Sequence, residues 1–275
     1  MIKKSLIVML FPVAAWATPE ITVINPQAAT SPVATLAVTV QKNLEDSRYY
    51  QGESCQDAVK KFENTPNSLI AYGTNLAITG LRKKQPCDVS VTKDNILFHG
   101  EQYYQICTKK DSGKNFRTQG ATLGVASVQP IDSIVEDINQ QNSTTLKPMP
   151  FSGSQAVLLQ LLSGDLDLGL IGTSTADKQS RSGAIDCIAS TDPRDSKFWG
   201  NQLKMKQADI RIQTLILHNI TDATALERAR AAIGSDAVKS LLEQGQYTEV
   251  YFAGSESLVE RARKYIQRSH ESYGK

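Results

Sequence analysis

The stretch that decides the fold runs from residue 149 to residue 170 and reads MPFSGSQAVLLQLLSGDLDLGL. It starts with a short apolar segment, 149–151, followed by a turn at Ser152-Gly153. Apolar side chains then recur with helical spacing as far as Leu162, and Ser163-Gly164-Asp165 closes that helix. Leucines at every second position follow, as is typical of a strand. Strand, turn, helix and strand in this order predict a βαβ unit of a parallel sheet.

The same order of elements occurs earlier in the chain. Residues 21–24 form a β-branched run that ends at Asn25-Pro26, which predicts a strand and its end. Ser31-Pro32 then supplies an N-cap and a first-turn proline for a helix over 33–44. A further repetition comprises a helix over 55–62, a strand over 68–72 and a helix over 73–81.

Two longer extended stretches, 96–108 and 210–217, interrupt this rhythm. We expect them to cross between two α/β lobes with largely parallel sheets. The expected boundaries are 18–104 plus 216–275 for the first lobe and 105–215 for the second. The end of the chain should add helices over 223–233, 235–243 and 256–268 and a strand over 248–252.

The N-terminus has the three zones of a secretory signal. Lys3 and Lys4 give a positive start, an apolar run covers 5–16, and Ala15-Trp16-Ala17 is a small-x-small cleavage site. The other interpretation is a membrane anchor, but a span needs roughly 20 apolar residues and this run is shorter. We expect residues 1–17 to be a signal peptide cleaved after Ala17, which would place the mature protein in the periplasm.

Length and charge narrow the class of protein. Removal of 17 of the 275 residues leaves 258, which suits one large domain or two lobes of about 100 to 130 residues each. Lys3 and Lys4 leave with the signal, so 28 basic side chains face 28 acidic ones. A nucleic-acid-binding protein usually has a basic surplus, so no nucleic-acid partner is expected.

The four cysteines, Cys55, Cys87, Cys107 and Cys187, all lie in the part expected to be exported, where thiols oxidise readily. Their even number favours two disulfides, for which three connectivities are possible. Their spacings match neither a CxxC zinc pattern nor a redox dithiol. Neither a metal nor another cofactor is therefore expected.

Three segments carry a resemblance to a known family. The most specific comprises FSGSQA at 151–156 and LLSGDLDL at 161–168; the others are 21–31 and 72–75. With the order of elements, they resemble the periplasmic solute receptors of tripartite tricarboxylate transporters. The resemblance implies the α/β, two-lobed type II periplasmic-binding-protein fold, each lobe a mostly parallel sheet flanked by helices. It also implies a small organic acid held between the lobes and delivered to a membrane transporter.

The first loop departs from the pattern of that family. Members usually have paired glycines there and an acidic residue just after them, whereas this chain has Ala28-Ala29-Thr30-Ser31. How a polar or amino substituent of a ligand would be recognised therefore does not carry over. The resemblance implies the fold more strongly than the ligand.

The candidate ligand-binding residues lie mainly in loops that open predicted helices. Helix starts carry unpaired N–H donors and the positive end of the helix dipole, so they bind carboxylates without Arg or Lys. Ligands of open α/β sheets bind beyond the carboxyl ends of the strands, where these loops lie. The other interpretation is that the Ser and Thr residues only cap helices. The candidates are Gln27, Ala28, Ala29, Thr30, Ser31, Gly73, Thr74, Asn75, Ser127, Ser152, Gly153, Ser154, Gln155 and Thr173.

The expected lobes favour one disulfide pairing. With crossings near Tyr104 and Leu215, the first two cysteines fall in the first lobe and the last two in or beside the second. A disulfide between lobes would restrain the hinge closure that traps ligands. The expected pairs are therefore Cys55 with Cys87 and Cys107 with Cys187.

A secreted hydrolase is the main competing class. The histidines His99, His218 and His270 form no HExxH pattern, and residues 151–155 lack the leading glycine of a Gly-x-Ser-x-Gly elbow. Because the usual nucleophile and base are missing, no enzymatic activity is expected. A monomeric receptor is expected instead, and its membrane partner stays open between transporter subunits and a sensor kinase.

Overall fold

The computed structural model describes residues 19–27, 29, 31–85, 87–126, 131–151 and 153–273. The predicted signal peptide and its cleavage site after Ala17 lie outside these residues. Within the described ranges, no helix combines the length and the apolar character needed to cross a bilayer.

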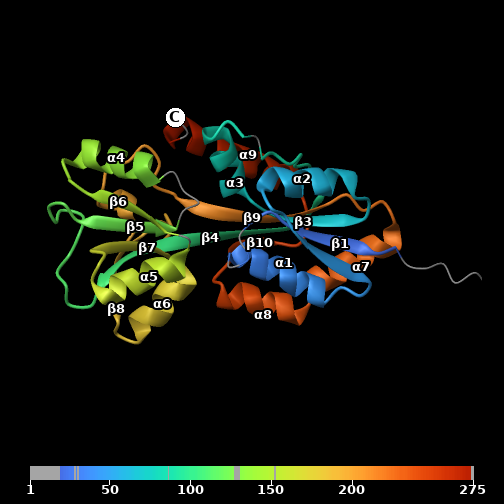
Figure 1. The fold of residues 1–275 in the computed structure, drawn as a ribbon, viewed down its shortest axis with the longest axis horizontal. Helices are drawn as coiled ribbons and strands as arrows, with labels where there is room; N and C mark the ends of the chain where they lie inside the picture. The colour runs from blue at the N-terminus through green and yellow to red at the C-terminus, as the bar shows by residue number, and fades with distance from the viewer. Residues whose placement is uncertain are drawn as a thin grey trace, which may run out of the picture.

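The chain forms two α/β lobes that share one long strand (Figure 1). This strand, β4 (Ile96–Lys109), runs from lobe I into lobe II, so the extended segments expected around 96–108 are one continuous strand. The strand order is β2-β1-β3-β9-β4-β7-β5-β6, and β10 and β8 also pair with β4. Lobe I contains β1 (Ile21–Asn25), β2 (Ser47–Gln51), β3 (Ser68–Gly73), β9 (Arg211–His218) and β10 (Thr248–Tyr251); lobe II contains β5 (Thr122–Ala126), β6 (Lys147–Phe151), β7 (Leu168–Gly172) and β8 (Ile185–Ser190).

Helices flank the sheet on both faces in each lobe (Figure 1). Their apolar sides build separate cores, with α1, α7 and α8 on one face of lobe I and α2, α3 and α9 on the other. In lobe II, α4 packs on one face and α5 and α6 on the other. The helices are α1 (Pro32–Lys42), α2 (Cys55–Asn64), α3 (Thr74–Arg82), α4 (Ile131–Asn142), α5 (Ser154–Ser163), α6 (Thr173–Arg181), α7 (Ala223–Ile233), α8 (Asp236–Gln244) and α9 (Glu256–Tyr273), with a 3-10 turn, η1 (Trp199–Asn201).

The pattern of strand pairing changes where the two lobes meet. We call β4 and β9, which run through this region, the hinge strands. Parallel pairs join β2, β1 and β3 in lobe I and β6, β5 and β7 in lobe II, whereas β4 pairs antiparallel with β9 and then with β7 and β8. Strand β9 begins with Arg211 opposite Tyr103 and lies between β3 and β4. Residues 211–215, expected in the second lobe, therefore pair with strands of lobe I.

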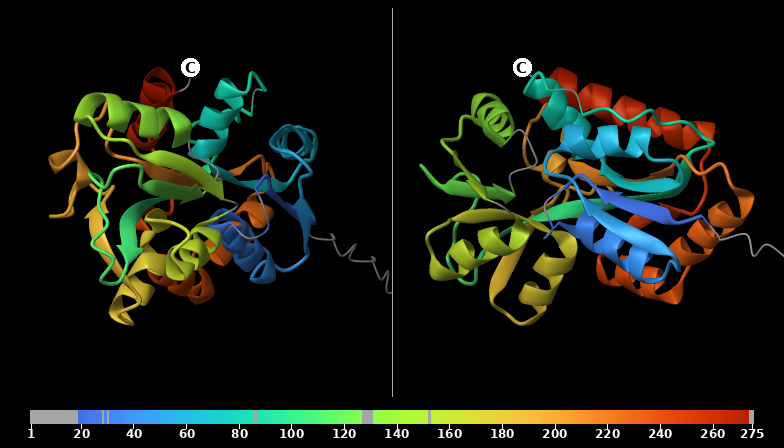
Figure 2. Two further views of the ribbon diagram at one scale, coloured as in Figure 1. Left: turned by 60° about the vertical axis from the view of Figure 1, so that its left-hand side comes forward. Right: turned by 45° about the vertical axis from the view of Figure 1, so that its right-hand side comes forward.

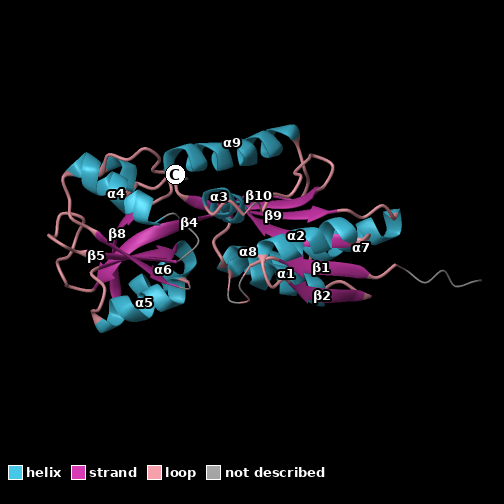
Figure 3. Cartoon of the chain, turned by 45° about the horizontal axis from the view of Figure 1, so that its top comes forward, coloured by secondary structure: helices cyan, strands magenta, loops and turns pink. Residues whose placement is uncertain are grey.

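Helix α9 connects both lobes without being part of the sheet. It lies over the hinge strands (Figures 2 and 3), where the hydroxyl of Tyr265 donates to the carbonyl of Arg211 at 2.6 Å. Its first half packs Val259 in the core of lobe I. Its last residue, Tyr273, is buried in the core of lobe II, and its hydroxyl donates to the carbonyl of Gln207 at 2.8 Å.

Each disulfide lies within one lobe. Cys55 at the start of α2 is bonded to Cys87 beyond α3, and Cys107 of β4 is bonded to Cys187 of β8. This is the pairing expected from the lobe assignment. Neither bond restrains the movement of one lobe against the other.

Four elements of the described chain, β2, α6, β8 and η1, were not predicted from the sequence. Strand β2, SRYYQ, is a partly exposed strand at the end of the sheet order and shows no apolar alternation. Helix α6, TSTADKQSR, buries Ala176 alone and so lacks an apolar stripe. Strand β8, IDCIAS, carries an aspartate and buries only three of its six residues. Helix α9 also extends five residues beyond its expected end at 268.

Candidate functional site

The carboxyl ends of the parallel strands in the two lobes face each other across the hinge. Strand β3 ends at Gly73, which pairs with Thr214, and Thr214 pairs with Gly100 of β4. Strand β7 runs the opposite way and ends at Gly172, which pairs with Tyr104 of β4. Four residues of β4, or about 13 Å, separate these two points. The loops that open α3 and α6 therefore lie on opposing sides of one inter-lobe region.

Three of the helices that start at these ends have a glycine as N-cap. Gly73, Gly153 and Gly172 precede α3, α5 and α6, and no side chain in the described part of the chain caps these helices. By contrast, Ser or Asp oxygens cap α1, α2, α7, α8 and α9. Uncapped helix starts keep first-turn N–H donors free and carry the positive end of the dipole. One such start from lobe I and two from lobe II can thus bind anionic groups.

Two buried amides meet beside the start of α3. Nε2 of Gln27, in the loop after β1, donates to Oδ1 of Asn75 at 3.3 Å. Asn75 is 1% exposed, and its Nδ2 has no hydrogen-bond partner among the described residues. A Cβ on Gly73 would overlap both amide groups, so glycine is required for this approach. The pair leaves one buried donor available to an acceptor.

A second layer of amides holds the Gln27 loop. Oδ1 of Asn25 accepts from the backbone N–H of Gln27 at 3.1 Å, and Nε2 of Gln51 donates to the carbonyl of Gln27 at 2.7 Å. Nδ2 of Asn25 also donates to Oε1 of Gln51 at 2.9 Å. Sequence reasoning missed Asn25 and Gln51 as supporting residues. A polar residue ending a buried strand is the one local signal that Asn25 offers.

Several predicted hydroxyl groups make structural hydrogen bonds. Oγ of Ser31 accepts from the N–H of Ala34 at 3.0 Å, which is the helix-capping role weighed as the alternative. Oγ1 of Thr74 accepts from the N–H of Gln213 at 3.3 Å, and Oγ1 of Thr173 donates to the carbonyl of Tyr103 at 2.8 Å. These two bonds tie the opposing loops to the hinge strands.

Of the remaining predicted ligand-binding residues, one joins two loops, two are exposed and four lie outside the described residues. Ser154 begins α5, and its Oγ accepts from the N–H of Gly172 at 3.1 Å, so it joins the α5 and α6 loops. Ala29 and Gln155 are exposed. The predicted ligand residues Ala28, Thr30, Ser127 and Ser152 lie outside the described residues.

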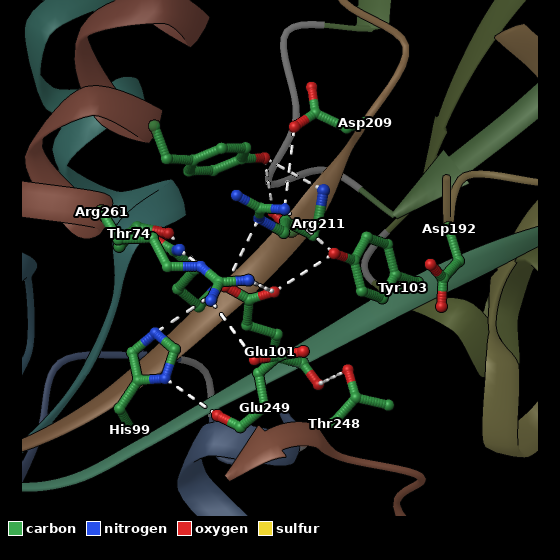
Figure 4. Close-up of polar contacts among 12 residues, drawn as sticks. Thr74, His99, Glu101, Tyr103, Asp192, Asp209, Arg211, Thr248, Glu249 and Arg261 are labelled. Carbon is green, nitrogen blue, oxygen red and sulfur yellow. Dashed lines mark hydrogen bonds and ion pairs between the residues drawn. The ribbon is translucent and has the colours of Figure 1, made fainter. Parts of the chain in front are cut away.

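A buried charge network lies beneath α9 at the hinge (Figure 4). The carboxylate of Glu101 on β4 is fully buried and accepts from Nε2 of Gln213 at 2.9 Å. Arg261 of α9 places Nε 3.0 Å from it, and Arg211 of β9 places Nε 3.6 Å from it. The hydroxyl of Tyr103 donates to the same carboxylate at 3.1 Å. Both hinge strands and α9 therefore share one buried anion, which sequence reasoning did not find.

His99, which is fully buried, belongs to this network. Its Nδ1 lies 3.1 Å from the carbonyl of Glu249, and its Nε2 lies 3.9 Å from Glu101. Burial lowers the pKa of His99, and this outweighs the opposite effects of the hydrogen bond with the Glu249 carbonyl and of the Glu101 carboxylate. Among the described residues, no group of three or more His, Cys, Asp or Glu side chains could hold a metal ion.

Comparison with solved structures identifies the fold. No protein-family model and no curated protein matches the sequence. The periplasmic binding protein BugD superposes with a TM-score of 0.68 at 14% identity, over 92% of this chain and 97% of BugD. MatC from Rhodopseudomonas palustris, solved with bound malate, gives 0.63 at 13% identity over 96% of this chain and 100% of MatC. An R. palustris protein solved with adipate gives 0.64 at 14% identity over 94% and 98%. The two-lobed type II periplasmic-binding-protein fold is thus confirmed.

Proposed function

We propose that this protein is a periplasmic receptor that binds a small organic acid between its lobes and delivers it to a membrane transporter. The observation that carries the proposal is the arrangement of the uncapped starts of α3, α5 and α6 on facing strand ends, with Nδ2 of Asn75 unpaired beside α3. These groups are hydrogen-bond donors, and carboxylate oxygens are acceptors.

A ligand with two acidic groups suits donors on both lobes. One carboxylate would bind Asn75 and the start of α3 in lobe I, and the other the starts of α5 and α6 in lobe II. Proteins with this fold have been solved with malate and with adipate, which are dicarboxylates. The proposed contact residues are Gln27, Gly73, Thr74 and Asn75 on lobe I and Gly153, Ser154, Gln155 and Thr173 on lobe II.

The proposed compartment follows from the predicted signal and from the cysteines. Both disulfides of the structure suit an oxidising compartment such as the periplasm. BugD, which shares the fold, is a periplasmic binding protein.

Isothermal titration calorimetry of the mature chain tests the ligand class. Malate, succinate and adipate should bind more tightly than acetate or butyrate, because only a diacid engages donors on both lobes. Malamide and adipamide are the matched neutral controls and should bind at least tenfold more weakly. Equal binding of acids and amides, or binding of amines or sugars in preference to acids, would reject the proposal.

Capture from solubilised membranes tests the partner. Ligand-loaded receptor should retain membrane transport subunits, and the apo receptor should retain less of them. Retention of a sensor kinase in their place would assign the receptor to signalling and contradict the delivery step, while leaving acid binding intact.

A further inference from the structure

Residues 246–249, which comprise the end of the loop after α8 and the first two residues of β10, have an unusual backbone. Gln246 has φ 51° and Glu249 has φ 50°, the left-handed region that residues with a Cβ seldom adopt. The pairing of β10 with β4 is also irregular between Thr248 and Tyr251. Strained conformations persist where surrounding contacts hold them. We call these four residues the clasp.

The first clasp contact crosses from lobe I to α6 of lobe II. Nε2 of Gln246 donates to Oδ2 of Asp177 at 2.6 Å. The other oxygen of Asp177 accepts from Nε2 of Gln105 at 2.6 Å. Gln105 belongs to the part of β4 that pairs with β7 and β8, so Asp177 is held within lobe II. Gln246 of lobe I is therefore hydrogen-bonded to the carboxylate of Asp177, which a residue of lobe II holds in place.

The second contact reaches the loop that follows β8. Arg194 donates from Nη1 to Oε1 of Glu249 at 3.2 Å and from Nη2 to Oγ1 of Thr248 at 3.0 Å. Asp192, in the same loop, accepts from Nε at 2.9 Å and from Nη2 at 2.8 Å and so orients the guanidinium. Strands β7 and β8 lie on opposite edges of β4, because both pair with residues 105–107. The two contacts therefore reach lobe II at two separate elements, helix α6 and the loop after β8.

The clasp also continues into the buried network. Oε2 of Glu249 lies 3.3 Å from Nη1 of Arg261, and Arg261 pairs with Glu101. The carbonyl of Glu249 lies beside Nδ1 of His99. In lobe I the clasp is therefore linked to the fully buried Glu101 and His99, while its contacts to lobe II are partly exposed.

We propose that the clasp sets the angle between the lobes: a change in that angle must break the Gln246–Asp177 hydrogen bond and the contacts from Arg194 to Thr248 and Glu249. The left-handed backbone at 246 and 249 directs both side chains to lobe II; at Gln246 it also closes α8, where the N–H of Tyr247 donates to the carbonyl of Leu242 at 3.0 Å. The device itself does not depend on which ligand binds.

Distances between lobes measure the effect directly. Spin labels at exposed Lys239 on α8 and Gln140 on α4, attached through an unnatural amino acid, leave the disulfides intact, and double electron–electron resonance reads their separation. The double variant Arg194→Gln with Gln246→Ala should raise the population of other lobe arrangements roughly 3- to 10-fold. The matched control is Arg230→Gln, which removes an arginine paired with Glu227 inside α7 and should leave the distances unchanged.

Further variants separate the contact from the backbone. Gln246→Gly relieves the left-handed strain but also removes the contact, so it should broaden the distances as Gln246→Ala does. If the double variant does not fold, Arg194→Gln alone and the wild-type chain in 1 M NaCl, which screens the partly exposed ion pair, decide the matter. A distance distribution identical to wild type in these samples would overturn the proposal.

Discussion

Asn75 and Gln27, 48 residues apart in the chain, are hydrogen-bonded to each other, and the Asn75 amide keeps its own Nδ2 unpaired within the described structure. A buried donor without a partner costs stability unless a ligand or water accepts from it. The Gln27–Asn75 hydrogen bond therefore joins the loops after β1 and β3 beside one unpaired donor, Nδ2 of Asn75.

Asn75→Asp should abolish acid binding, because it replaces the free donor by a carboxylate that repels an anionic ligand. Asn75→Ala should weaken malate or adipate binding roughly 10- to 100-fold, the value of one hydrogen bond to a charged group. Calorimetry measures both. Asn64→Asp adds the same charge at an exposed residue of α2 and should bind as wild type. Unchanged affinity in Asn75→Ala would remove Asn75 from the site.

Gly73→Ala should lower the affinity for malate or adipate because it displaces the loops after β1 and β3, not because a contact with the ligand is lost. The added Cβ would overlap Asn75 Oδ1 and Gln27 Nε2 and drive the two amides apart. Gly172→Ala is the matched control, since its Cβ would lie 3.6 Å from Oγ of Ser154, an ordinary contact, at another glycine N-cap. Calorimetry and thermal melting check both variants. Equal effects of the two substitutions would contradict the steric argument.

Glu101→Gln should destabilise the fold by about 3–5 kcal/mol, because it removes the fully buried counter-charge of Arg211 and leaves only Asp209, 3.7 Å away and partly exposed. Chemical denaturation measures the loss. Glu256→Gln removes an exposed partner of Lys93 and should change stability by less than about 0.5 kcal/mol. A loss below 1 kcal/mol in Glu101→Gln would show that the network is not needed for stability.

Stability should fall as the pH drops through 6.5. Burial lowers the pKa of His99 below this ordinary value, so the unfolded chain takes up a proton that the folded chain does not. The loss begins near pH 6.5 and levels off below the folded pKa. Burial also lowers the pKa of His218, which adds to the trend. Glu101, Arg211 and Arg261 face the ring of His99 and set the rest of its charge environment.

His99→Gln should flatten this part of the profile of melting temperature against pH, since the amide does not titrate and can still donate to the Glu249 carbonyl. His270→Gln, outside the network, is the control and should follow wild type. A profile for His99→Gln that coincides with wild type would exclude His99 as a source of the trend.

Local signals in the sequence determined much of the fold. The cap at Ser31, the breaker at Asn25-Pro26 and the leucine alternation at 166–170 act over a few residues, and the elements formed close to where they were predicted. The glycine-led starts of α3 and α5 also follow from local sequence. Elements without an apolar period, such as β2 and α6, gave no such signal.

Only the tertiary structure decided which distant side chains meet. Strand register placed Arg211 opposite Tyr103, and packing of α9 brought Arg261 to Glu101. The contact of Gln246 with Asp177 depends on how the two lobes sit on one strand. Periodicity and capping are short-range properties of the backbone, whereas these contacts join residues separated by 69 to 160 positions. The sequence by itself therefore determined the elements that have an apolar period or a cap, and the strand register and lobe packing determined the buried charges and the clasp.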